Sequence, residues 1–313
     1  IVDRTPGGFT GRNEPAMSAS MVPEELKQAI QWAVAVLQDS DRSAAGADPN
    51  ADARLDSQLL LSHILAKPRS FLFTWPDHTL SAQERANFES MVRRRAAGEP
   101  VAYLIGHCAF WTLNLLTDHS TLIPRPDTET LVQAVLERLP SISLDVVDLG
   151  TGTGAIALAL ASERPLWRMM GLDCFDEVVQ LARRNGARNN LPQVRFLRSD
   201  WCAVLADHSV DALVSNPPYI RPDDPHLEQG DVRYEPRSSL AADEQGLADF
   251  RTIVKQSGRV LRAGGWLFFE HGFEQAEDVA LLLIDAGFAQ VDTLRDMGGR
   301  PRVTLGQWPQ RII

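Results

Sequence analysis

The sequence has few of the residues that mark disulfide-bonded, membrane-spanning or strongly basic proteins. It contains three cysteines in 313 residues, and neither a CxxC pair nor a Cys/His spacing suggests a zinc site. We therefore expect a reduced, cytoplasmic chain without a metal. No apolar run approaches the roughly 20 residues that cross a bilayer, and the N-terminus lacks the apolar core of a signal peptide.

Positive charge is also scarce. Lys and Arg number 31 against 41 Asp and Glu, which gives a formal net charge of −10. This argues against a general duplex DNA or RNA binder, whose affinity comes largely from neutralising phosphates, although a local basic patch can sit on an acidic protein. The length is typical of about two domains, and 44% hydrophobic residues suffice for a sizeable core.

The N-terminal part predicts an extension followed by helices. Residues 1–21 are rich in Gly, Pro and Ser, and we expect a disordered extension there. Residues 22–100 show helical spacing and predict a small all-helical domain for substrate recognition. Within it, Ser81 and Glu84 have the spacing of a capping box that opens a helix.

A linker is expected between this domain and the rest. Residues 101–124 include alternating apolar positions, with Trp111, Leu113 and Leu115 on one face of a predicted hairpin. Asp127 is then predicted to cap the helix that begins "TETLVQAVLERL".

Residues 125–313 predict an α/β domain. Short apolar segments such as "LDVVDLG", "WRMMGLD" and "VDALVSN" alternate with helical patterns. This alternation is typical of a largely parallel sheet with helices on both faces. Ligands of such sheets bind outside the carboxyl ends of the strands, so functional residues are expected there.

A glycine-rich turn follows the first of these strands. "DLGTGTG" places Gly150, Gly152 and Gly154 between a strand and a helix, where the backbone can approach a ligand closely. Asp173 ends the next strand, where a carboxylate can accept both ribose hydroxyls of a nucleoside. The combination indicates a nucleoside site, with a tight turn that binds nothing as the alternative.

The residues around this turn favour S-adenosylmethionine over NAD or ATP. The turn lacks the later glycine of the dinucleotide fingerprint, and no nearby Lys or Arg would hold a pyrophosphate. Asp148, just before the turn, suits a ligand with an amino group and a sulfonium. Asp200 and Trp201 follow another strand and suit an adenine ring, although Trp201 is alternatively a core residue.

The tetrapeptide Asn216-Pro217-Pro218-Tyr219 ends the strand that begins at Val210. Methyl transfer to an amide or exocyclic amino nitrogen requires acceptors for both N–H bonds, because the lone pair is delocalised. The side-chain oxygen of Asn216 and the carbonyl of Pro217 can accept them. The prolines hold that carbonyl rigidly, and Tyr219 can lie against the planar target. Catalysis would then be mostly positioning, and glutamine and adenine both stay open as targets.

Several motifs together resemble the release-factor glutamine methyltransferases, the PrmC/HemK family. They are "LIPRPDTETLV", "SDW", "SNPPYI", "GDVRYEP", "GGWLFFEHG" and "GGRPRV", within a similarity that covers about residues 22–308. The resemblance implies a class I methyltransferase (Rossmann-like) fold, with a seven-stranded, mostly parallel sheet whose last strand is antiparallel. It also implies methyl transfer from S-adenosylmethionine, which leaves S-adenosylhomocysteine, to the glutamine amide nitrogen in the Gly-Gly-Gln motif of class I peptide chain release factors.

The resemblance assigns roles to particular residues. The residues expected to bind the cofactor are Gly150, Thr151, Gly152, Thr153, Gly154, Asp173, Trp201 and Asn216. The residues expected to hold the glutamine are Asn216, Pro217, Pro218 and Tyr219, among which Asn216, Pro217 and Tyr219 are the predicted catalytic residues. We expect a monomer that contacts no specific nucleic acid directly. Cys108-Ala109 departs from the more charged residues usual in the family, which puts only the packing of the linker in doubt.

Other functions share the tetrapeptide. A sister family methylates a ribosomal-protein glutamine, but usually reads Arg-Ser-Pro where this chain has Arg125-Pro126-Asp127. An adenine-N6 DNA methyltransferase would need to flip its base and grip phosphate, which the acidic balance and the lack of a basic target-recognition segment disfavour. The intact tetrapeptide disfavours a regulator that only binds S-adenosylmethionine.

Overall fold

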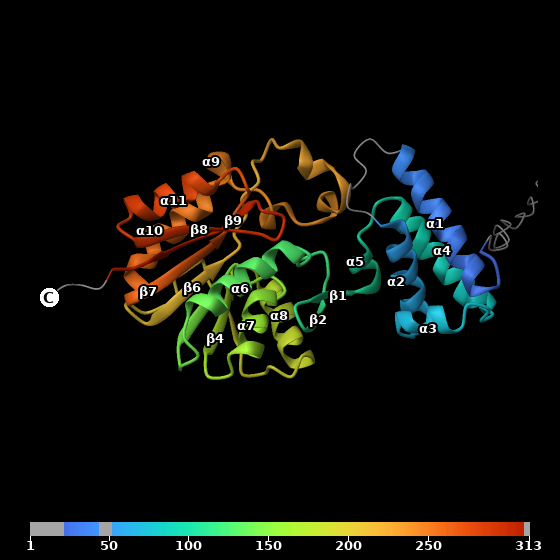
Figure 1. Ribbon diagram of the computed structural model, residues 1–313, viewed down its shortest axis with the longest axis horizontal. Helices are drawn as coiled ribbons and strands as arrows, with labels where there is room; N and C mark the ends of the chain where they lie inside the picture. The colour runs from blue at the N-terminus through green and yellow to red at the C-terminus, as the bar shows by residue number, and fades with distance from the viewer. Residues whose placement is uncertain (1–21, 44–51, 310–313) are drawn as a thin grey trace, which may run out of the picture. The chain divides into compact units, whose positions relative to one another are not determined.

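The computed structural model describes residues 22–43 and 52–309 (Figure 1). The chain divides into two compact units, one with the described residues up to Ala97 and one with those from Gly98 onward. The predicted extension, residues 1–21, lies outside the described residues. The boundaries predicted at residues 100 and 124 stay predictions. Across the described residues, no helix is both long and apolar enough to cross a membrane.

The first unit is helical. It contains α1 (Leu26–Ser43), α2 (Ala53–Leu65), α3 (Arg69–Thr74) and α4 (Ala82–Ala96), of which α1, α2 and α4 pack against one another. The predicted capping box at the start of α4 is confirmed, because Ser81 Oγ accepts from the Glu84 N–H at 3.2 Å and the Glu84 carboxylate accepts from the Ser81 N–H at 2.7 Å. Arg95 pairs with Asp56 at 2.7 Å and ties α4 to α2.

The second unit begins with α5 (Val101–Ile105) and a hairpin of β1 (His107–Phe110) and β2 (Leu113–Leu116). Leu113 and Leu115 are buried, as the alternation predicts. Trp111 differs from the prediction, because it lies in the turn with φ of 55° and not on a strand. The hairpin pairs Phe110 with Leu113, and the two residues between them must reverse the chain.

The sheet contains seven strands in the order β5-β4-β3-β6-β7-β9-β8. The strands are β3 (Asp145–Leu149), β4 (Arg168–Asp173), β5 (Arg195–Arg198), β6 (Val210–Ser215), β7 (Leu261–Glu270), β8 (Ala289–Arg295) and β9 (Pro301–Gln307). β3 to β7 pair in parallel, and β9 is antiparallel to β7 and β8. The predicted fold class is therefore confirmed.

Helices cover both faces of this sheet (Figure 1). One face carries α6 (Glu129–Arg138), α7 (Ala155–Glu163) and α8 (Asp176–Arg188), and the other carries α10 (Ala248–Val260) and α11 (Ala276–Asp285). Successive strand residues face opposite sides, so Val146 and Phe268 belong to one buried cluster while Val147 and Leu267 belong to the other. The strands are thus apolar on both faces, as buried parallel strands must be.

The start of α6 corrects one prediction. Residues Pro126–Thr128 form a short 3-10 helix, η1, and Thr128 occupies the N-cap position with helical φ and ψ of −65° and −19°. Asp127 is therefore not the cap. Its carboxylate instead pairs with Arg302 on β9 at 3.0 Å.

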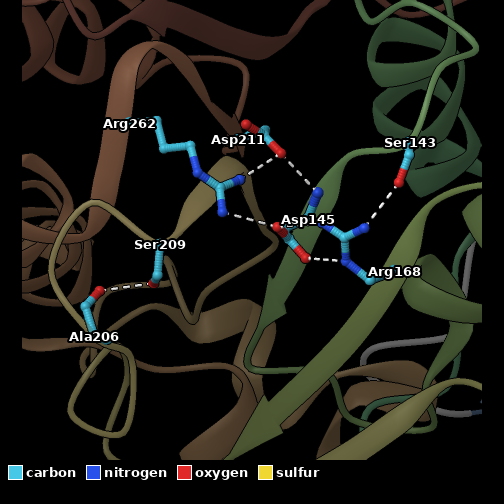
Figure 2. Close-up of polar contacts among 7 residues, drawn as sticks. All are labelled: Ser143, Asp145, Arg168, Ala206, Ser209, Asp211 and Arg262. Carbon is cyan, nitrogen blue, oxygen red and sulfur yellow. Dashed lines mark hydrogen bonds and ion pairs between the residues drawn. The ribbon is translucent and has the colours of Figure 1, made fainter.

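An ion-pair network joins the strands near their amino ends (Figure 2). Arg168 binds both oxygens of Asp145 at 2.6 Å and the Ser143 hydroxyl at 2.8 Å. Arg262 bridges Asp145 at 2.9 Å and Asp211 at 2.7 Å. These contacts connect β3, β4, β6 and β7 at the amino-end edge of the sheet. The residues predicted to be functional lie at the opposite edge, at the carboxyl ends of the strands.

Candidate functional site

A pocket of about 280 Å³ opens at the carboxyl edge of the sheet. Four parallel strands deliver residues to its wall: Gly150 follows β3, Asp173 ends β4, Asp200 follows β5 and Asn216 follows β6. The chain leaves β3 toward β4 on one side, while β6 pairs on the other side. Such a reversal of strand order creates a crevice, and ligands of α/β sheets bind there.

The glycine-rich turn forms one side of the pocket. Gly150, Gly152 and Gly154 have φ of 70°, 54° and 84°, a left-handed region that side chains rarely adopt. Gly150 to Thr153 line the pocket. Gly154 starts α7, and an added Cβ would approach the Phe196 ring to 3.0 Å, so this glycine permits close packing.

Asp173 connects the glycine-rich turn to β4. Its Oδ2 accepts from the Gly152 N–H at 3.1 Å, and its Oδ1 accepts from the Phe175 N–H at 3.3 Å. Burial raises the pKa of this carboxyl, while the backbone hydrogen bond from Gly152 acts in the opposite direction. The carboxylate therefore both shapes the turn and faces the pocket that the turn encloses.

Asp148 lies beneath the turn and is fully buried, so it does not form part of the pocket wall. Its Oδ2 accepts from Thr151 Oγ1 at 2.6 Å and from the Ala157 N–H at 3.3 Å. Desolvation raises its pKa to about 7. Its observed contacts stabilise the turn from below, whereas the sequence suggested direct contact with a cationic ligand.

Aromatic side chains form another part of the wall. Trp201 lines the pocket and also packs on the glycine-rich turn, because a Cβ on Gly150 would lie 3.4 Å from its ring. Phe175 lines the pocket as well, with 43% of its surface exposed. The sequence prediction missed Phe175, although an aromatic residue two positions after the strand-end acid was a usable signal.

Asn216 stands where β6 enters the pocket wall. The preceding Ser215 is fully buried and its hydroxyl donates to the Leu149 carbonyl at 2.8 Å, which fixes the end of β6 to β3. The Nδ2 of Asn216 donates to Thr128 Oγ1 at 3.3 Å. Thr128 also lines the pocket and was missed from sequence, because its contact with Asn216 spans 88 residues.

The remaining tetrapeptide residues divide between the wall and the interior. Pro218 lines the pocket, whereas Pro217 is buried. The ring of Tyr219 is half-buried against the core cluster on the α10 face, and burial raises the pKa of its hydroxyl. Its backbone is held on both sides, since its N–H donates to the Leu240 carbonyl at 3.2 Å and its carbonyl accepts from Gln275 Nε2 at 3.0 Å.

A segment with three 3-10 turns covers one side of the pocket. The turns are η2 (Pro225–Glu228), η3 (Gly230–Tyr234) and η4 (Arg237–Ser239). Ser238 and Ser239 line the pocket. Glu235 anchors the segment, because its buried carboxylate pairs with Arg125 and accepts from the Ile123 N–H at 3.3 Å. Desolvation raises the pKa of Glu235 to about 7.

Family models match both parts of the chain. A model described as "PrmC N-terminal domain" matches residues 28–106, and one described as "Methyltransferase small domain" matches residues 126–229.

Curated relatives align over most of the chain. A protein of Pseudomonas aeruginosa named "Release factor glutamine methyltransferase" is 52% identical over 256 residues, which are 82% of this chain and 93% of the relative. A Vibrio cholerae protein of the same name is 48% identical over 284 residues, 90% of this chain and 96% of the relative. The Escherichia coli protein of that name is 45% identical over 257 residues, which are 82% of this chain and 93% of the relative.

Proposed function

This chain belongs to the release factor glutamine methyltransferase family, and we propose that it methylates the side-chain amide nitrogen of a glutamine in class I peptide chain release factors. S-adenosylmethionine is the methyl donor. The target glutamine is that of the Gly-Gly-Gln motif, which the motif resemblance of this sequence implies.

One observation carries the proposal: Asn216, which opens the rigid Asn-Pro-Pro-Tyr segment, shares a single pocket wall with Asp173 and the glycine-rich turn. The turn and the acid suit the nucleoside of the donor. The carboxamide suits a planar nitrogen that must be presented to it. A protein that only bound the donor would not require this second group.

We assign the cofactor to the residues around the turn. Asp173 receives the ribose hydroxyls, and Trp201 contacts the adenine. The other residues of this set are Gly150, Thr151, Gly152, Thr153, Gly154 and Asn216. The donor, when bound, supplies an electrophilic methyl group on a positively charged sulfur.

The chain's own residues prepare the nitrogen. Asn216 Oδ1 and the Pro217 carbonyl accept its two N–H bonds, which aims the remaining electron density at the methyl group. We assign Pro218, which lines the pocket, to contact the planar amide, and Tyr219, whose ring packs on the core, to hold the tetrapeptide that presents it. The N–CH₃ bond would form as the S–CH₃ bond of the donor breaks, which leaves S-adenosylhomocysteine, and because no strong base is needed before attack, the surplus proton is lost to water afterwards. Positioning of this kind can lower a barrier by about 7–11 kcal/mol.

The decisive experiment compares three substrates side by side. The full chain is incubated with methyl-labelled S-adenosylmethionine and a purified release factor, ribosomal proteins or duplex DNA. We expect label in the Gly-Gly-Gln peptide of the release factor. Label only in ribosomal protein or only in DNA would replace the proposal by one of those alternatives.

Asn216→Ala tests the role of the carboxamide. The substitution removes one acceptor of the target amide, so methyl transfer should fall by at least about tenfold. Most of the affinity for S-adenosylhomocysteine should be kept, because the other residues of the cofactor set remain. Turnover within about twofold of the native protein contradicts the clamp.

We further propose that a single chain acts, in the cytoplasm, without contacting specific nucleic acid. The net charge of −10 disfavours phosphate binding. Light scattering of the active protein tests the single chain, and its activity after nuclease treatment tests the independence from nucleic acid.

A further inference from the structure

Glu270 is a buried carboxyl group at the end of β7, and only 1% of its surface is exposed. β7 runs parallel to β6 with Phe269 opposite Ser215, so Glu270 follows in step with Asn216. Its Oε2 has no hydrogen-bond partner within the described part of the chain. Burying a carboxylate that is incompletely hydrogen-bonded costs stability, and an apolar side chain would avoid that cost. A group of this kind calls for an explanation.

The surroundings of Glu270 connect it to the pocket. Desolvation raises its pKa to about 7, while the Thr128 hydroxyl, the charge of Arg302 and the Asn216 carboxamide favour its ionised form. Arg302 also pairs with Asp127 at 3.0 Å and thereby holds the turn that carries Thr128. Glu270 itself does not line the pocket, but Thr128 and Asn216 do.

The carboxamide of Asn216 has two ends of similar shape and opposite hydrogen-bonding character. Rotation of the carboxamide by half a turn would place its N–H donors where an acceptor is required, and these donors would repel the N–H groups of the substrate amide. Nδ2 donates to Thr128 Oγ1 at 3.3 Å, but a hydroxyl could equally donate to Oδ1, so this contact selects one orientation only if the hydroxyl proton is directed elsewhere. In its ionised form the Glu270 carboxylate can only accept, so it takes the Thr128 hydroxyl proton and leaves Oγ1 as an acceptor for Nδ2. The flipped orientation is then penalised, because Oδ1 would face oxygen lone pairs.

We infer that Glu270 is a positioning residue which, together with Thr128, holds the amino end of the Asn216 carboxamide and so directs Oδ1 toward the substrate amide. The inference rests on the proposed function, because that function makes Oδ1 the acceptor. Glu270 acts through Asn216 and does not touch the reacting atoms.

Two pairs of variants of the full chain test this inference. Glu270→Gln keeps the shape but offers an N–H as well as an oxygen, so it no longer discriminates between the two ends. Thr128→Val removes the acceptor, and Thr128→Ser is its matched control because it keeps the hydroxyl. With a release factor as substrate, we expect kcat to fall at least about tenfold in Glu270→Gln and Thr128→Val, and less than about threefold in Thr128→Ser.

Two further measurements separate positioning from loss of structure. Calorimetric titration with S-adenosylhomocysteine should give a dissociation constant within about twofold of the native value for Glu270→Gln. In NMR spectra, the side-chain NH₂ protons of Asn216 should exchange with water faster in Glu270→Gln and Thr128→Val than in the native protein. This readout does not depend on methyl transfer.

The outcomes are distinguishable. A native protein that does not methylate the release factor contradicts the proposed function, and the NMR measurement still decides the inference about Glu270. The inference is overturned if Glu270→Gln keeps the native kcat, or if its affinity for S-adenosylhomocysteine falls by as large a factor as kcat. It is also overturned if the exchange rate of the Asn216 NH₂ protons is unchanged in Glu270→Gln. Thr128→Val decides in the same way if Glu270→Gln does not fold.

Discussion

Gly246→Ala is expected to displace the backbone of the Asn-Pro-Pro-Tyr tetrapeptide. Gly246 is the last residue of α9 (Asp243–Gly246) and has φ of 84°. A Cβ at this position would lie 2.1 Å from the Tyr219 carbonyl oxygen and 2.8 Å from Gln275 Nε2, the donor to that oxygen. Alanine must therefore push the tetrapeptide backbone away from its anchor as well as adopt a left-handed conformation.

The cost has two parts that a control can separate. A left-handed residue with a side chain loses about 1–2 kcal/mol, and overpacking adds about 1–3 kcal/mol. Gly287 has φ of 90°, and an added Cβ would meet no atom within 4 Å. Gly287→Ala should therefore lose only the first part, whereas Gly246→Ala should lose about 2–5 kcal/mol in total.

The assay is urea unfolding of both variants and the native protein, together with kcat on a release factor. The two variants should differ by about 1–3 kcal/mol in the free energy of unfolding. Gly246→Ala should also lower kcat, because Tyr219 is three residues from Asn216, and Gly287→Ala should not. If Gly246→Ala and Gly287→Ala are equally destabilised and have the same kcat, the reasoning is refuted, because the carbonyl of Tyr219 would then move without cost.

Two other predictions concern carboxylates. Asp173→Ala should weaken S-adenosylhomocysteine binding by at least about 10- to 150-fold, the range for the loss of a single hydrogen bond to a charged group. The matched control is Asp176→Ala, and a calorimetric affinity loss of less than twofold in Asp173→Ala refutes the prediction. Burial raises the pKa of Glu270 from 4.5 to about 7, so its contribution to stability is full below about pH 4.5 and is lost as the pH rises through about 7. The free energy of unfolding of the native protein should therefore fall more than that of Glu270→Gln between pH 5 and 8. If the two proteins show the same pH dependence of this free energy, the raised pKa of Glu270 is contradicted.

Local patterns were sufficient for much of the fold. The capping box at Ser81 depends on residues three positions apart, and the strand at Val210 must stop at Pro217, because neither feature needs a distant partner. The cap predicted at Asp127 was wrong for the opposite reason. Its carboxylate is taken by Arg302, 175 residues away, and no local pattern reports that contact.

The candidate site divides in the same way. The glycine-rich turn, Asp173 and Asn216 could be recognised from sequence, because each follows an apolar strand and parallel strands bring their carboxyl ends to one edge. The roles of Thr128, Glu270 and Gln275 could not, because each acts on the tetrapeptide through a contact that only the folded chain creates. The sequence by itself determined how strands and helices alternate along the chain and which side chains are available for chemistry. Only the tertiary structure decided which way those groups face, because orientation depends on neighbours that are distant in the chain.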